Sequence, residues 1–177
     1  MMMTPEVRKL GLTAHVSSSL GWFGSVVAFL ALAISGLTSS ETQIVRAAYL
    51  AMDMIGWFVI VPLSLASLLT GLVQSLGTPW GLFRHYWVVV KLLITVFATL
   101  LLLLHMQPVG HLAGVVAART LESGELAGLR VQLIADAGAA LFALLAAATL
   151  SVYKPRGRTR YGWRKLREEL ANQRRAC

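Results

Sequence analysis

The chain has 177 residues, of which 56% are hydrophobic and 14% charged, and its mean hydropathy is +0.68. These values are too apolar for an ordinary soluble domain, and the apolar runs recur along most of the length instead of forming one anchor. We therefore expect a single integral membrane domain.

The net charge of +8 is concentrated near the C-terminus, because nine of the 16 basic residues lie between Lys154 and Arg175. Basic residues beside a membrane span mark its cytoplasmic side and contact anionic lipid headgroups. This interpretation is favoured over nucleic-acid binding. Cys177 is the only cysteine, which excludes an intramolecular disulfide and argues against a cysteine-ligated cluster. The first apolar run has span length and no cleavage motif, so no cleavable signal is expected.

Four apolar segments are long enough to cross a bilayer, which takes about 20 residues. They cover residues 14–37, 47–76, 86–106 and 129–152. Pro62 lies near the middle of the second segment and predicts a kink, because its ring displaces a backbone hydrogen bond. The longest loop is expected at residues 107–128. The predicted fold is an all-α, four-helix transmembrane bundle.

The basic residues also predict the orientation of the bundle. Arg8, Lys9, Arg84 and the basic tail fall on one side of a four-span arrangement, whereas the opposite loops carry charges of both signs. By the positive-inside rule, both termini are cytoplasmic. The tail, residues 154–177, predicts a turn and a short amphipathic helix that rests on the anionic inner leaflet.

Counting about 1.5 Å per residue gives the depth of each polar residue within the bundle. His15 and Lys91 fall at similar depth near the cytoplasmic side. His105 follows Lys91 by 14 residues on the same helix face and therefore lies near the outer side. Two polar levels result: an inner one with His15, Arg84, His85 and Lys91, and an outer one with Asp53, His105, His111 and Asp136.

Each of these residues also has a purely structural interpretation. Lys91 would then extend its ammonium to the cytoplasmic headgroups, and the histidines would be interfacial. Asp53 would pair with Arg46 or Arg130, or hydrogen-bond across helices. The tryptophans would serve packing or the aromatic belt.

A functional interpretation starts from His15 and Lys91 as a pair. Two nitrogen ligands at one depth on different helices can hold a haem inside a membrane bundle. Lysine ligates as the neutral amine, a form that burial favours. His15 is the expected axial ligand of haem b, and Lys91 the second ligand or a propionate partner. The residues expected to line or flank the site are Trp22, Arg84, His85 and Trp87.

Two short patches carry a resemblance to a known family. Trp22 follows His15 by seven residues, and Trp87 precedes Lys91 by four. In these patches the chain resembles the small membrane proteins of the bacterial haem-b-containing protoporphyrinogen oxidase type, and their relatives among copper-resistance D proteins and predicted integral membrane proteins. The resemblance implies that His15 and Lys91 are the haem-linked pair, in a multi-pass protein of the bacterial inner (cytoplasmic) membrane.

The chain departs from the oxidase pattern at two places. The first span ends AISGLTSS, where the family has a proline-arginine segment, and the third ends with His105 alone, where the family has a histidine-tyrosine cluster. The resemblance therefore points to haem binding more than to protoporphyrinogen oxidation, as expected of a cytochrome-like redox or haem-handling component.

Two other functions stay open from the sequence. Intramembrane carboxylates often mark ion paths, so Asp53, His105 and Asp136 are candidate metal or ion ligands of a small transport protein. His105 with His111 is a further candidate metal pair. Alternatively, the chain would be a non-catalytic subunit, and its glycine- and alanine-rich faces would pack against a membrane-protein partner or a second copy. Hydrolase motifs such as Gly-x-Ser-x-Gly or His-Glu-x-x-His are absent from the sequence.

Overall fold

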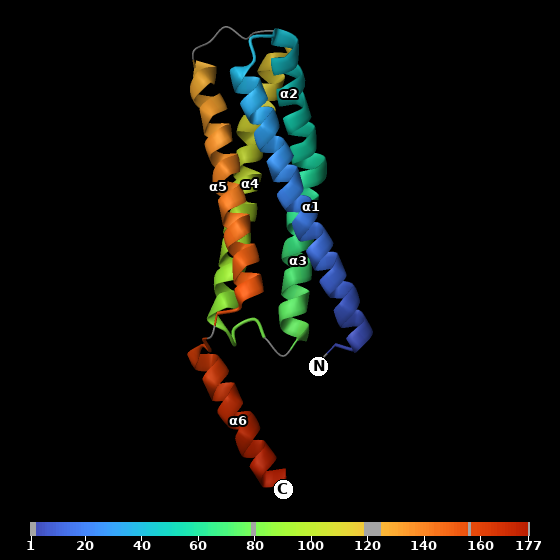
Figure 1. Ribbon diagram of the computed structural model, residues 1–177, viewed down its shortest axis with the longest axis vertical. Helices are drawn as coiled ribbons and strands as arrows, with labels where there is room; N and C mark the ends of the chain where they lie inside the picture. The colour runs from blue at the N-terminus through green and yellow to red at the C-terminus, as the bar shows by residue number, and fades with distance from the viewer. Residues whose placement is uncertain (1–2, 79–80, 119–124, 156, 177) are drawn as a thin grey trace.

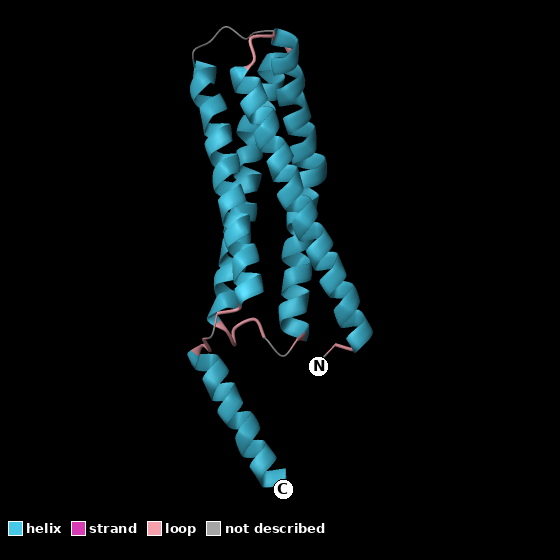
Figure 2. Ribbon diagram, in the orientation of Figure 1, coloured by secondary structure: helices cyan, strands magenta, loops and turns pink. Residues whose placement is uncertain are grey.

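The computed structural model describes residues 3–78, 81–118, 125–155 and 157–176, and these are almost entirely helical (Figures 1 and 2). The elements are α1 (Pro5–Thr38), α2 (Thr42–Ile55), a π-helical turn η1 (Gly56–Ile60), α3 (Val61–Gly77), α4 (Tyr86–Ala117), α5 (Glu125–Tyr153) and α6 (Arg160–Ala176). Four helical stretches are long and apolar enough to cross a membrane: Pro5–Thr38, Thr42–Gly77, Tyr86–Val116 and Ala127–Tyr153. The expected all-α bundle of four long apolar helices is confirmed.

The four long helical stretches pack as a square bundle. α1 lies against α2, α3 and α5, and α4 lies against the same three helices. α1 and α4 have no extensive backbone contact with each other, so they lie across the diagonal. Both termini lie at the same end of the bundle, where the connection between α3 and α4 also lies (Figure 1).

The surface of the bundle carries many large apolar side chains. Large hydrophobic side chains on all four stretches are more than half exposed, including Leu20, Phe58, Phe97 and Phe142. A soluble protein rarely leaves so many such side chains in contact with water. In a bilayer these side chains contact lipid, and the buried residues between the helices form the protein core, which includes Trp22, Phe29, Tyr49, Met52, Met106 and Leu112.

The second stretch is irregular shortly before Pro62, the residue at which the sequence predicts a kink. Proline has no N–H and its ring crowds the carbonyl four residues earlier, so the regular ladder cannot continue through it. The structure accommodates this with η1, in which the N–H of Val61 donates to the carbonyl of Gly56, five residues back. The proline therefore acts through a π turn that directly precedes it.

The third stretch is longer than predicted, and the prediction of a long loop after it was wrong. α4 continues through Pro108 to Ala117, so most of the loop expected at residues 107–128 is helical, and α5 begins at Glu125. Residues 119–124 lie outside the described part of the chain. A proline inside a long membrane helix is tolerated because neighbouring helices support the backbone around it. α1 likewise begins at Pro5, well before the expected start at residue 14, with Thr4 accepting from the N–H of Val7.

The tail forms the expected turn and helix. α5 ends at Tyr153, and the next residue, Lys154, has a left-handed φ of 42° directly before Pro155. The segment before α6 then pairs with the connection between α3 and α4: the N–H of Thr159 donates to Arg84 O at 3.0 Å, and the N–H of Tyr86 donates to Gly157 O at 3.4 Å. In Figure 1, α6 runs away from the end of the bundle. The placement of α6 on the inner leaflet therefore stays a prediction.

Candidate functional site

His15 and Lys91 meet across the diagonal of the bundle. His15 Nε2 lies 3.3 Å from Lys91 Nζ, and both side chains are half-buried. The similar depth that counting along the helices predicts is thus confirmed by a direct contact. Lys91 turns into the bundle in this structure and does not extend to the headgroups.

Helix α3 fixes the orientation of the His15 ring. His15 Nδ1 lies 3.1 Å from the carbonyl oxygen of Ser67 and 3.1 Å from the hydroxyl of Thr70. Because a carbonyl only accepts, Nδ1 carries the proton in the neutral ring, and Nε2 presents its lone pair to Lys91. A histidine that binds a metal is commonly held in this way, with its second nitrogen donating to a backbone carbonyl.

The packing of α3 against α1 depends on small residues at this level. A Cβ on Gly71 would lie 3.1 Å from Cε1 of His15, so the glycine leaves space for the ring. The hydroxyls of Ser19 and Ser67 are 2.7 Å apart just beside it. The sequence analysis missed these α3 residues. Their signal is a series of small polar residues at one-turn spacing, Ser64, Ser67 and Thr70, followed by Gly71, inside an otherwise apolar span.

His15 is the sole hydrogen-bond partner of the Lys91 amine within the described ranges, and no carboxylate there forms an ion pair with it. An ammonium in hydrocarbon is unfavourable unless it is paired or reaches water. An amine and an imidazole that face each other with no carboxylate between them place two nitrogen ligands close together. Such a pair suits a metal centre that takes nitrogen ligands.

The other four residues that were predicted to line or flank the site lie at different places in the structure. Trp22 is 2% exposed in the core, two turns along α1 from His15. Trp87 is half-buried, one turn before Lys91 on α4. Arg84 and His85 lie outside the bundle, at the junction with the tail. There Arg84 forms an ion pair with Glu169 at 2.8 Å, and His85 pairs with Arg158 through the backbone.

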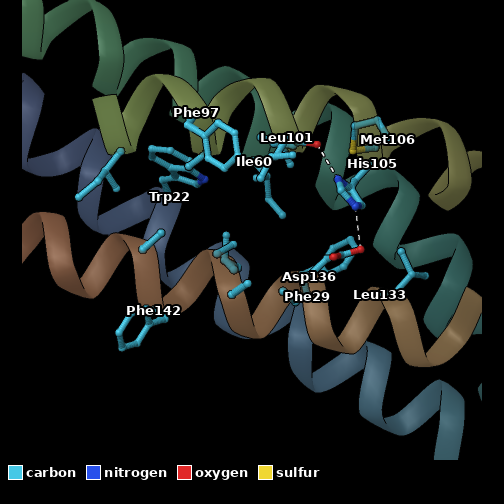
Figure 3. A pocket seen from close by; sticks show the side chains of 18 of the residues that line it. Trp22, Phe29, Ile60, Phe97, Leu101, His105, Met106, Leu133, Asp136 and Phe142 are labelled. Atoms are coloured by element: carbon cyan, nitrogen blue, oxygen red, sulfur yellow. Dashed lines mark hydrogen bonds and ion pairs between the residues drawn. The ribbon is translucent and has the colours of Figure 1, made fainter. Parts of the chain in front are cut away.

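At the outer level the structure joins two of the predicted metal ligands. His105 Nε2 lies 2.8 Å from Asp136 Oδ2, and His105 Nδ1 lies 2.7 Å from the carbonyl oxygen of Leu101 (Figure 3). His111 is exposed. Among the described residues no three His, Cys, Asp or Glu side chains come close enough to hold a metal ion. Asp53 therefore does not complete a three-ligand site with His105 and Asp136.

Asp53 has a different environment. Its Oδ1 is buried without a hydrogen-bond partner among the described residues and lies against Gly110 of α4. Neither Arg46 nor Arg130 forms an ion pair with it within these ranges. The Arg130 guanidinium instead lies over the ring of Tyr49, 5.6 Å from its centroid.

A cavity of about 390 Å³ runs between α1, α4 and α5, and the sequence analysis did not foresee it (Figure 3). Its lining is apolar except for His105 and Asp136 at one end and the indole nitrogen of Trp22. The sequence signal is the alanine-rich face of α5, because small side chains opposite bulky ones leave space between helices. His15 and Lys91 do not line it.

Comparison with known proteins adds no further assignment, since no protein-family model, curated protein or solved structure matches the chain.

Proposed function

We propose that the chain is a haem-b-binding membrane protein, a cytochrome-like redox or haem-handling component, with His15 as the axial ligand. The observation that carries the proposal is the contact between His15 Nε2 and Lys91 Nζ at 3.3 Å, with His15 Nδ1 held by the Ser67 carbonyl. It combines an oriented imidazole lone pair with a second nitrogen donor inside an apolar bundle.

The two nitrogens fit the group by their chemistry, because haem iron takes nitrogen ligands. His15 Nε2 and Lys91 Nζ, which lie 3.3 Å apart, are the atoms that would hold the iron. When bound, the haem would supply one-electron redox chemistry. The protein residues supply ligation, the fixed ring orientation and an apolar surround.

The test is the absorption spectrum of the detergent-purified chain, oxidised and after dithionite, with a pyridine haemochrome assay. We expect a Soret band and about one haem per chain. His15→Ala should abolish the band, whereas His111→Ala, which changes an exposed histidine of α4, should leave it intact. A chain that stays colourless when haem is supplied during expression, or a full spectrum in His15→Ala, would overturn the proposal.

The orientation of the bundle in the membrane can be proposed from the basic residues at one of its ends. Arg8, Lys9, Arg84 and the basic tail all belong to the end where both termini lie (Figure 1). By the positive-inside rule we propose that this end faces the cytoplasm. The resemblance of the patches around His15 and Lys91 to bacterial membrane proteins leads us to propose the inner membrane of a bacterium. His15 and Lys91 then lie on the cytoplasmic side. Cysteine scanning with a membrane-impermeant maleimide tests the proposal: a cysteine at Gln173 should react only after the membrane is opened.

A further inference from the structure

The cavity described above is long and narrow. Along α4 it follows the residues from Ile94 to Val109, which is roughly 22 Å of helix axis. Its volume of about 390 Å³ lies in the usual range for a site that holds a small organic molecule. The shape and the apolar lining suit a molecule that is mostly hydrocarbon.

The cavity also reaches the outer surface of the bundle. Phe97 of α4 and Phe142 of α5 line it, yet they are 63% and 75% exposed. The gap between these two helices therefore opens beside the two rings, at a level where the bundle is surrounded by lipid. A hydrophobic molecule can pass between the cavity and the bilayer without crossing water.

The polar end of the cavity is a histidine–carboxyl pair. His105 Nδ1 lies 2.7 Å from the Leu101 carbonyl oxygen, and His105 Nε2 lies 2.8 Å from Asp136 Oδ2. The imidazole and the carboxyl are complementary to each other, so this end needs no charged ligand. The carboxyl keeps lone pairs that can accept a hydrogen bond from a hydroxyl.

A second polar group faces the cavity from α1. Trp22 is 2% exposed, lines the cavity, and its Nε1 has no hydrogen-bond partner among the described residues. In Figure 3 the indole nitrogen is turned toward the cavity. An indole nitrogen is a donor only, and a buried donor without an acceptor is unfavourable because it has lost its hydrogen bond to water. A bound molecule with an oxygen at this point would satisfy it.

The two polar points lie at different levels along the bundle axis. The contact between His15 and Lys91 fixes the relative level of α1 and α4, which run in the same direction. Trp22 follows His15 by seven residues, and His105 follows Lys91 by 14, so the backbone positions of Trp22 and His105 differ in level by seven residues, or about 10 Å along the axis. A para-hydroquinone carries its two oxygens on opposite sides of the ring, so it can meet one polar point at each level.

We propose that this cavity binds a membrane-soluble para-hydroquinone that carries a hydrocarbon tail. The carboxyl of Asp136 accepts a hydrogen bond from one ring hydroxyl, and Trp22 Nε1 donates to the oxygen on the opposite side of the ring. Phe29 and Met106, both buried, line the cavity and give an aromatic head group favourable packing partners. The tail leaves between Phe97 and Phe142 into the bilayer.

The test is equilibrium binding to the full chain in lipid nanodiscs, under anaerobic conditions, with a radiolabelled hydroquinone bearing a ten-carbon tail. We expect saturable binding at one site per chain, and weaker binding of the oxidised quinone, which has no hydroxyl to donate to Asp136. Trp22→Phe removes the N–H together with the five-membered ring that carries it, and should weaken binding at least about fivefold, the value of one neutral hydrogen bond. Ala143→Phe fills the cavity and should abolish saturable binding.

The matched control is Ala148→Phe, on an exposed α5 residue that does not line the cavity, and it should bind like the unchanged chain. Equal binding by Ala143→Phe and Ala148→Phe would overturn the proposal. So would equal affinity for the oxidised and reduced forms, or displacement of the hydroquinone by dodecanol at the same concentration as by unlabelled hydroquinone.

Discussion

Replacing Gly162 with alanine should release the tail from the bundle. Gly162 lies in the first turn of α6, and a Cβ built there would clash with the carbonyl oxygen of Arg84. The clash is with backbone, so no side-chain rotation can relieve it. The connection between α3 and α4 and the start of α6 must therefore move apart.

The size of the effect follows from the contacts that would be lost. Two backbone hydrogen bonds, Thr159 to Arg84 and Tyr86 to Gly157, and the side-chain bond from Thr159 to the Phe83 carbonyl hold the segment. At about 1 kcal/mol each they total about 3 kcal/mol. The exposed ion pair between Arg84 and Glu169 adds at most about 1 kcal/mol. Alanine recovers about 1 kcal/mol through its helix propensity. The net loss is about 2 to 3 kcal/mol.

Amide hydrogen exchange measures this loss directly. The N–H groups of Tyr86 and Thr159 are the donors in the two backbone bonds, so both should exchange about thirty- to a hundredfold faster in Gly162→Ala, while the helicity of α6 is kept or raised. Gly138→Ala is the matched control, because no atom lies within 4 Å of its Cβ position. Unchanged protection of Tyr86 and Thr159 in Gly162→Ala would show that the docking contacts are not those described.

Two further predictions concern packing and pH. Leu112→Ala should lower the free energy of unfolding by about 2 to 5 kcal/mol because this side chain is fully buried, whereas Leu104→Ala on the lipid-facing side of α4 should change it little; reversible unfolding in mixed micelles compares them. The hydrogen bond with Lys165 lowers the pKa of Glu168 below its ordinary 4.5, and the same bond raises the pKa of Lys165 above its ordinary 10.5. The pair's contribution to the stability of α6 should therefore be lost as the pH falls below the pKa of Glu168 or rises above the pKa of Lys165. Amide exchange or circular dichroism across both pH ranges would detect this loss. An α6 that is equally ordered at all pH values would contradict the prediction.

The four spans could be predicted because length and hydropathy alone decide whether a helix can cross a bilayer. The helix ends could not, because they are set by local contacts. α1 begins at Pro5 through the Thr4 cap, and α4 passes through Pro108 because its neighbours support the backbone there. A polar or proline-containing stretch ends a helix in water more readily than inside a bundle.

The inner site was predictable in part for a similar reason. Helical rise fixes depth, so the level of His15 and Lys91 could be counted from the sequence. Rotation about each helix axis depends on packing, and it decides which neighbours a side chain meets. Counting therefore could not show that Ser67 orients His15, that Asp136 pairs with His105 and Asp53 does not, or that a cavity separates the two levels.

The π turn before Pro62 makes the length of the second span as important as its composition. Met52, Gly56, Ile60 and Ser64 are all buried at intervals of four residues, a spacing that drifts by about 40° per step around a regular α-helix. The wider turn offsets this drift. Deleting one residue within η1 would rotate α3 by about 100° and carry Ser67 away from His15. A homologous chain that keeps the histidine is therefore expected to accept substitutions across this turn far more readily than an insertion or a deletion.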